Sequence, residues 1–232
     1  CIMANRYGAL LSLKSGETFI TPQSVPVCLY SKQTFSSVSN GALHYIEQLV
    51  NIPDATQPVI PFVLTSRQAA CAVWIESNGQ LAVRAYEILN TAFTLTVYLF
   101  TIFPQPMPNP PYGLAVWDDQ TGNLVITHES KILTDVVTVG TIGANGGIYI
   151  DESRAGKWAI IPDVAGQQVW RISGGGPGGQ LWPVPVTFTA VYNGASTRIY
   201  TAATQAIPSG SAQAMAPVNA GNTVIAVEVS KY

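Results

Sequence analysis

The sequence predicts an all-β protein made of two tandem β-sandwich-like domains that arise from an internal repeat. Three observations predict this fold class. The same motifs recur in the same order after about 100 residues, short apolar segments are separated by Gly and Pro turns, and helical periodicity is scarce. We expect one domain at 1–103, a second at 112–232, and between them a stiff linker at 104–111, which has five prolines in eight residues.

The first repeated motif is a Tyr-Gly pair, an apolar run, a Gly-containing turn and Ile-Thr. It occupies 7–21 in one half and 112–127 in the other, and its tyrosines, Tyr7 and Tyr112, are 105 residues apart. Because Gly adopts a positive φ without strain, each turn predicts a β-hairpin. We expect both tyrosines to anchor the core of their domain.

The second repeated motif is a Trp-containing strand followed by Gly-Gln-Leu. Trp74 and Trp170 are 96 residues apart, and the two leucines, Leu81 and Leu181, are 100 residues apart. Large indole rings fill the space between two sheets well, so both tryptophans are expected core anchors. The turn between Trp and Leu is short in the first half and becomes a glycine-rich loop at 174–179 in the second.

The remaining strands are predicted from apolar runs and from the alternation of apolar and polar residues. Phe93–Phe103 alternates in this way and is too short to span a membrane as a helix. Leu43–Val50 instead has apolar residues at the three- and four-residue spacing that favours a short helix. The other expected strands are Val59–Thr65, Lys157–Ile161, Val186–Tyr192 and Val224–Val229.

Two segments of the second half have no counterpart in the first. We expect 174–179 to be a mobile surface loop or a recognition loop, since a phosphate-binding loop would need a helix directly after it. The segment 194–222 is long and rich in small polar residues, which predicts an interface arm or hairpin that packs on a neighbouring subunit. The candidate interface or recognition residues are Gly174, Gly175, Gly176, Pro177, Gly178, Ile199 and Tyr200.

The three cysteines, Cys1, Cys28 and Cys71, all lie in the first half. Cys28 and Cys71 belong to apolar runs, which favours buried free thiols, with a disulfide between them as the alternative. No cysteine has the spacing of a zinc site. An N-terminal cysteine also occurs in lipidated bacterial proteins, although no Ser/Gly-rich tether follows Cys1 here.

Neither half carries a catalytic motif. His44 and His128 lie in different halves without a nucleophile nearby, and the acidic pairs at 118–119 and 151–152 lie in turn-like sequence. The turn at 118–123 resembles only a fragment of a calcium loop. We therefore expect no enzyme activity, no catalytic or metal-binding residue and no cofactor. A glycan hydrolase is the alternative, and it requires two carboxylates about 5–10 Å apart in a cleft.

The charge pattern restricts the partners. The net charge is −2, only 10% of residues are charged, and the Lys and Arg residues are scattered singly, which argues against nucleic-acid binding. No apolar run is long enough to insert into a membrane. A surface with so little charge predicts that much of it is buried in an assembly, for which we favour a homo-oligomer and in particular a trimer.

The Tyr-Gly motifs carry a resemblance to a known group of proteins. The pattern at 7–21, and more closely the pattern at 112–127, resembles small tail-associated virion proteins of bacteriophages and prophages. The resemblance covers about 20 residues of each half and defines no functional residue. It implies a structural or adhesive part of a phage tail tip, baseplate or fibre, with other virion tail proteins as partners and a host surface receptor or glycan as ligand. A capsid decoration protein, a secreted bacterial adhesin and a carbohydrate-binding module are the alternatives.

Overall fold

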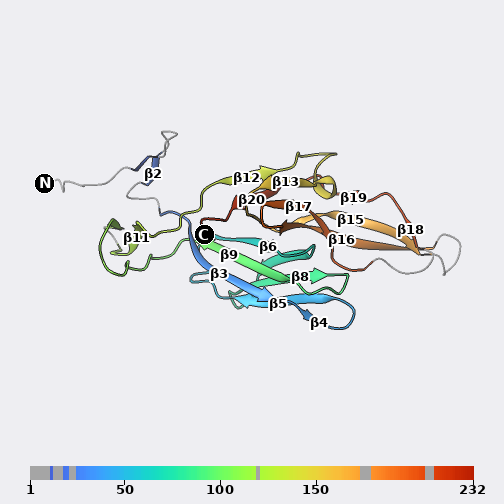
Figure 1. Cartoon of the computed structure of the whole chain (residues 1–232), viewed down its shortest axis with the longest axis horizontal. Helices are drawn as coiled ribbons and strands as arrows, with labels where there is room; N and C mark the ends of the chain where they lie inside the picture. The colour runs from blue at the N-terminus through green and yellow to red at the C-terminus, as the bar shows by residue number, and fades with distance from the viewer. Residues whose placement is uncertain (1–10, 13–17, 21–24, 119–120, 173–178, 207–211) are drawn as a thin grey trace.

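The computed structural model describes residues 11–12, 18–20, 25–118, 121–172, 179–206 and 212–232. Strands dominate these residues, and the one helical segment among them is a 3-10 turn, η1 (Gly147–Tyr149). The all-β prediction is therefore confirmed. Figure 1 shows the strands running mostly along the long axis of the molecule.

The strands of the first half are β1 (Leu11–Ser12), β2 (Thr18–Ile20), β3 (Cys28–Ser36), β4 (Val38–Ser39), β5 (His44–Val50), β6 (Val59–Thr65), β7 (Ala70–Ile75), β8 (Leu81–Glu87) and β9 (Thr94–Thr101). The strands of the second half are β10 (Ala115–Trp117), β11 (Leu124–Thr127), β12 (Val136–Val139), β13 (Glu152–Ala155), β14 (Trp158–Ile160), β15 (Val164–Ile172), β16 (Gln180–Tyr192), β17 (Ser196–Ala203), β18 (Ala212–Ala214), β19 (Val218–Asn219) and β20 (Val224–Glu228).

One sheet runs through both halves. In the first half β9 pairs with β3 and β6, in the second half β20 pairs with β12 and β14, and β6 pairs with β14 at Val63 and Ile160. All of these pairings are antiparallel, and both residues at the junction are fully buried. The prediction of two separate tandem domains is not confirmed, because the halves share this sheet and one hydrophobic core.

Within each half, the repeated motifs nevertheless pair their strands with the same register. The described strands of the two Tyr-Gly motifs form antiparallel pairs, β1 with β2 and β10 with β11. In the first pair the register shifts directly after Leu11 pairs with Ile20, and in the second directly after Val116 pairs with Ile126. An irregularity at the same motif position in both pairs is a specific feature, since such bulges are built into a fold rather than accidental.

The Trp motifs match in the same way. The residue after Trp74 pairs with Leu81, and the residue after Trp170 pairs with Leu181. Further along, Val97 of β9 lies between β3 and β6, and Ala226 of β20 lies between β12 and β14. The two residues therefore occupy equivalent positions in the two halves. Val97 and Ala226 are 129 residues apart, whereas Leu81 and Leu181 are 100 residues apart. The difference of 29 residues equals the length of 194–222, which identifies this segment as an insertion in the second half.

The described parts of 194–222, residues 194–206 and 212–222, contribute strands to the large sheet. Strand β17 lies between β13 and β16, and β18 and β19 pair with β15. Ile199 is fully buried and pairs with Glu152 and Ala190. Thr197, two residues before it, is buried on the same face, as the two-residue period of a strand requires. Ile199 therefore belongs to the interior of this chain and is not part of a free interface arm.

The short helix expected at Leu43–Val50 is wrong, because this segment is strand β5. It pairs along its whole length with β8, and Ile46 and Val50 are buried. A spacing of four residues returns to the same face of a helix and also to the same face of a strand, whose period is two. The spacing alone did not distinguish the two structures.

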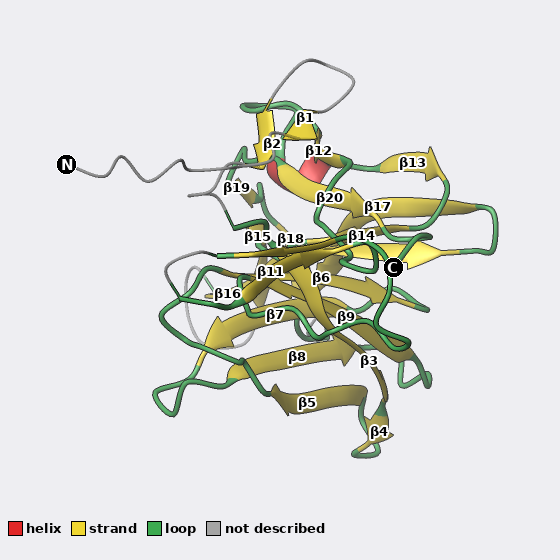
Figure 2. Ribbon diagram, turned by 90° about the vertical axis from the view of Figure 1, so that its left-hand side faces the viewer, coloured by secondary structure: helices red, strands yellow, loops and turns green. Residues whose placement is uncertain are grey.

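The four-stranded sheet formed by described strands has the order β4–β5–β8–β7. Figure 2 shows β5 and β8 as a layer beside β3, β6 and β9. Ile46 and Val83 of this layer share one core with Phe62 and Val97 of the large sheet.

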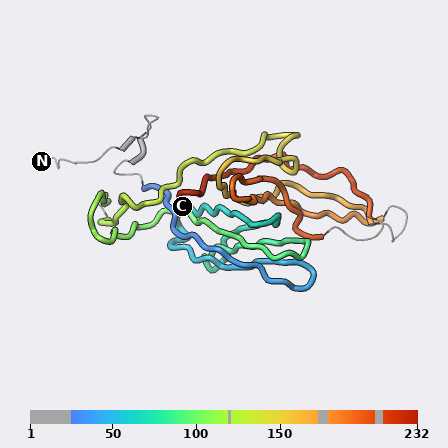
Figure 3. The backbone as a smooth tube through the Cα atoms, viewed as in Figure 1, coloured from blue at the N-terminus to red at the C-terminus, as the bar shows by residue number. Residues whose placement is uncertain are grey.

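The Pro-rich segment at 104–111 leads from β9 to the β10–β11 hairpin, and the chain then returns to β12 (Figure 3). Gln105 in this segment is buried. Its backbone N–H donates to the carbonyl of Leu124 at 2.7 Å, and Ser130 Oγ donates to its side-chain oxygen at 2.9 Å. These contacts attach the segment to β11, so it packs on its neighbours instead of acting as a free spacer.

Candidate functional site

The outward face of the four-stranded sheet carries an unusual set of side chains. Alternate residues of neighbouring strands meet on this face, so Leu49, Ala82 and Trp74 lie in one row across β5, β8 and β7. Glu47 and Arg84 lie side by side in the next row. Beside them in sequence, Ile46, Val50 and Val83 point the other way, into the core, whereas Gln48 is exposed.

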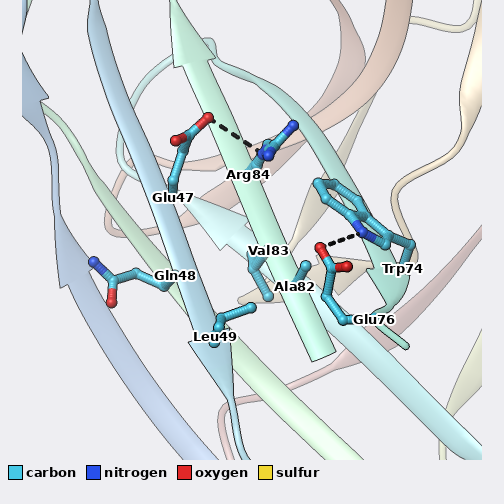
Figure 4. Close-up of a pocket in the computed structure, with 8 residues that line it drawn as sticks. All are labelled: Glu47, Gln48, Leu49, Trp74, Glu76, Ala82, Val83 and Arg84. Atoms are coloured by element: carbon cyan, nitrogen blue, oxygen red, sulfur yellow. Dashed lines mark hydrogen bonds and ion pairs between the residues drawn. The ribbon is translucent and has the colours of Figure 1, made fainter. Parts of the chain in front are cut away.

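These side chains surround a shallow pocket of about 460 Å³, which we call the Trp74 pocket. Figure 4 shows Trp74 and Glu76 on one side, Leu49 and Gln48 on the other, and Ala82 between them. The small Ala82 side chain leaves the hollow open. The lining residues are Glu47, Gln48, Leu49, Trp74, Glu76, Ala82, Val83 and Arg84.

The polar groups of the pocket hold one another in place. Arg84 Nε lies 3.2 Å from Glu47 Oε1, and its guanidinium lies over the Trp74 ring, 4.7 Å from the centroid. Trp74 Nε1 donates to Glu76 Oε1 at 2.8 Å, and the Tyr86 hydroxyl donates to Glu47 Oε1 at 3.0 Å. Burial, followed by the Glu47 carboxylate, raises the pKa of Tyr86. The phenol therefore stays protonated at neutral pH and remains a donor.

The four tyrosine and tryptophan anchors predicted from the repeat have different positions. Trp74 is half-buried at the pocket, and Trp170 is half-buried on β15 opposite Trp182 of β16. Tyr112 is 71% exposed and stacks on His128, so it lies at the surface and not in the core. Tyr7 lies outside the described residues.

Of the predicted recognition residues, the structure describes Ile199 and Tyr200. Gly174, Gly175, Gly176, Pro177 and Gly178 lie outside the described residues.

Tyr200 is half-buried on β17, and the Arg198 guanidinium lies 4.2 Å from its ring centroid. Arg198 also donates to both carboxylate oxygens of Asp151, at 2.8 and 2.7 Å, and this holds the pKa of Asp151 below its usual value. Tyr200 thus belongs to a local cluster on the surface of β17.

The other ionisable residues noted in the sequence take part in local structure. Glu152 Oε1 accepts from the Gly140 backbone at 3.0 Å, and His44 Nδ1 lies 3.0 Å from Ser37 Oγ. Asp118 binds the Thr121 hydroxyl within its turn. Across the described ranges, no three His, Cys, Asp or Glu side chains gather where they could hold a metal ion.

Cys28 and Cys71 are free thiols and both are buried, as expected from their apolar surroundings. Burial raises the pKa of Cys28 to about 11 and that of Cys71 to about 12. Both thiols are therefore neutral and unreactive near neutral pH, and neither is a nucleophile.

Glu47, Glu76 and Arg84 were not predicted as site residues from the sequence. Glu47 and Arg84 lie on alternating strand segments, and that alternation is the signal that they face outward together. The pairing of β5 with β8 had to be known before the three charges could be placed around Trp74, and the helix expected at Leu43–Val50 prevented this.

No family model, curated protein or solved structure matches this chain. The described part of the chain contains no helix with the length and apolarity that a membrane span requires.

Proposed function

We propose that this chain is a non-enzymatic structural and adhesion protein of a phage virion, located at the tail tip, baseplate or fibre. Its resemblance to tail-associated proteins and its low charge support this role. In this proposal the chain forms a homo-oligomer, with a trimer favoured, and contacts other virion tail proteins.

The observation that carries the proposal is the distribution of exposed apolar side chains. The β10–β11 hairpin and the β15–β16 ribbon lie at opposite ends of the long axis (Figure 1). Tyr112, Leu114 and Trp117 are 71%, 50% and 52% exposed at the first end, and Leu181 and Trp182 are 56% and 39% exposed at the second. Clustered apolar surface of this kind favours protein contacts. Contact between two different ends of neighbouring subunits gives a closed ring when the rotation between subunits permits it, and an open filament otherwise.

Electron microscopy with gold-labelled antibody tests the proposed location. Antibody raised against the purified chain is applied to phage particles released by the bacterium that carries the gene. Label at the tail end is the expected result. Label over the head would instead support a capsid decoration protein, and label on the bacterial surface alone would support a secreted adhesin.

Glycan hydrolysis is the second candidate, because Glu47 and Glu76 both line the Trp74 pocket. The contacts favour binding over hydrolysis. Each carboxylate accepts hydrogen bonds from fixed donors, whereas a hydrolase needs one protonated carboxyl to act as general acid. Incubation of the protein with oligosaccharides, followed by chromatography, separates the two functions. Shortened oligosaccharides that disappear in Glu47→Gln and Glu76→Gln variants would establish the enzyme.

A further inference from the structure

We propose that the Trp74 pocket binds one uncharged sugar residue of a neutral glycan. This inference rests on the proposed adhesion function, for which it names the class of ligand. It also names the surface that makes contact, the outward face of β5, β8 and β7.

The shape and the apolar part of the pocket suit a sugar ring. Ala82 forms a low floor between Leu49, which is 51% exposed, and the half-buried Trp74. A pyranose presents C–H groups on its faces and hydroxyls around its rim. Apolar walls that bury the C–H groups, with a few polar groups at the margin, form the usual composition of a small-molecule site.

The polar part of the pocket suits hydroxyl groups. The internal contacts engage Arg84 through Nε, Glu47 through Oε1 and Glu76 through Oε1. A guanidinium offers further N–H donors, and each carboxylate has a second oxygen. Neighbouring hydroxyls of a sugar can donate to the carboxylates and accept from the guanidinium. Because these side chains are already held in place, binding orders few additional rotamers.

The charge of the pocket selects against acidic sugars. Its lining contains two carboxylates and one guanidinium, which gives a net charge of −1 when all three are ionised. A ligand carboxylate, sulfate or phosphate would meet this excess negative charge at close range, whereas a neutral sugar would not. Uncharged hexoses are therefore the expected ligands.

The second half of the chain shows that the fold does not need these polar residues. The matching registers of the two Trp hairpins place Trp170 where the first half has Trp74. Ile172, Trp182 and Val184 then hold the places of Glu76, Ala82 and Arg84. In the second half a large ring stands where Ala82 leaves a hollow, and apolar side chains replace Glu76 and Arg84. The open, charged pocket is a property of the first half alone among the described residues.

A binding experiment with the full-length protein tests the proposal. The protein is applied to an array of neutral, sulfated and sialylated oligosaccharides, and the strongest neutral ligand is titrated by calorimetry. Ala82→Trp fills the hollow with the residue of the second half, and Arg84→Ala removes the donor. We expect each substitution to weaken binding at least about tenfold, a size typical of losing a charged hydrogen bond or a close contact.

Tyr149→Ala is the matched control, because Tyr149 is an exposed aromatic residue outside both the pocket and the proposed contact ends, and it should leave binding unchanged. Circular dichroism shows whether each variant keeps its strands, and Glu76→Gln gives a second, isosteric change in case Ala82→Trp fails to fold. Unchanged affinity in folded Ala82→Trp and Arg84→Ala, or a preference for acidic glycans, would overturn the proposal. Absence of binding to any neutral glycan would also overturn it and would favour a protein as the partner of this face. The tail location is tested separately by antibody labelling, so either claim can fail alone.

Discussion

Thr65 is a buried polar residue of the first half whose side chain forms hydrogen bonds with the second half. Its hydroxyl donates to the Ala190 carbonyl at 2.8 Å and lies 3.2 Å from the Thr189 hydroxyl. Both threonines are buried, so a partner that loses its hydrogen bond cannot be compensated by water. The junction between β6 and β16 therefore depends on this side chain as well as on apolar packing.

Thr65→Val should lower the free energy of unfolding by about 1–3 kcal/mol, because it leaves buried oxygens without a donor. Thr34→Val is the control, since Thr34 makes a similar contact of 3.0 Å with Thr96 at an exposed position. The control should change stability by less than about 0.5 kcal/mol. Urea unfolding measured by fluorescence compares the two, and equal losses would contradict the account.

The buried Cys71 thiol should lower the stability of the folded protein at alkaline pH. Burial raises the pKa of Cys71 from 9.0 to about 12, so the folded state holds its proton where the unfolded state releases it. The stability linked to this group is complete below pH 9 and is lost as the pH rises from 9 toward 12. Cys71→Ala should therefore reduce the fall in melting temperature across this range. A variant with the same alkaline fall as the wild type would show that Cys71 does not cause it.

Single residues were predicted with mixed success. The apolar runs around Cys28 and Cys71 correctly predicted free buried thiols, because burial follows from local composition. Tyr112 was expected in the core, yet the chain around it forms a small hairpin that is too thin to cover its ring. The burial of a large aromatic residue depends on what packs over it, and the sequence around Tyr112 does not contain that information.

At the level of elements, the junction of β6 and β14 is one of the two strand contacts that β6 makes with the second half. Ile160 is fully buried there and pairs with Val63. Ile160→Ala should cost about 2–5 kcal/mol, the range for removing a buried aliphatic side chain. Ile225→Ala on the neighbouring strand β20 is the control, since Ile225 is 43% exposed. Equal effects of the two substitutions on the urea midpoint would contradict a buried junction.

Elements with strong local patterns were predicted correctly. The apolar runs Val59–Thr65 and Lys157–Ile161 gave the central strands β6 and β14. Strand β3 was missed because most of its residues are polar and its burial alternates between partial and exposed. Its place beside β9 is fixed by pairing and not by hydrophobic content.

At the level of the whole molecule, the union of the halves was not predictable from their motifs. A sequence repeat indicates two similar units, but it does not say which edges of those units meet. Here β6 meets both β14 and β16, and the core is continuous across this junction. The Pro-rich segment suggested separation, because proline-rich stretches often join independent domains.

A fragment covering residues 112–232 should not fold alone, because β14 and β16 would lose β6 and expose Ile160 and neighbouring core residues. Expressed alone, it should aggregate or lack a cooperative thermal transition. Co-expression with 1–111 should restore a folded complex, which serves as the control. A soluble 112–232 fragment with its own sharp transition by circular dichroism would contradict the shared core.

The proposed role as a self-assembling virion protein is the central claim, and the mass of the full-length protein in solution tests it most directly. Light scattering after size-exclusion chromatography should give three times the chain mass of 24.7 kDa. Alanine at Trp117 or Trp182 should shift this mass downward, because both rings lie at the proposed contact ends. A mass of 24.7 kDa at every concentration up to the highest attainable would contradict the claim.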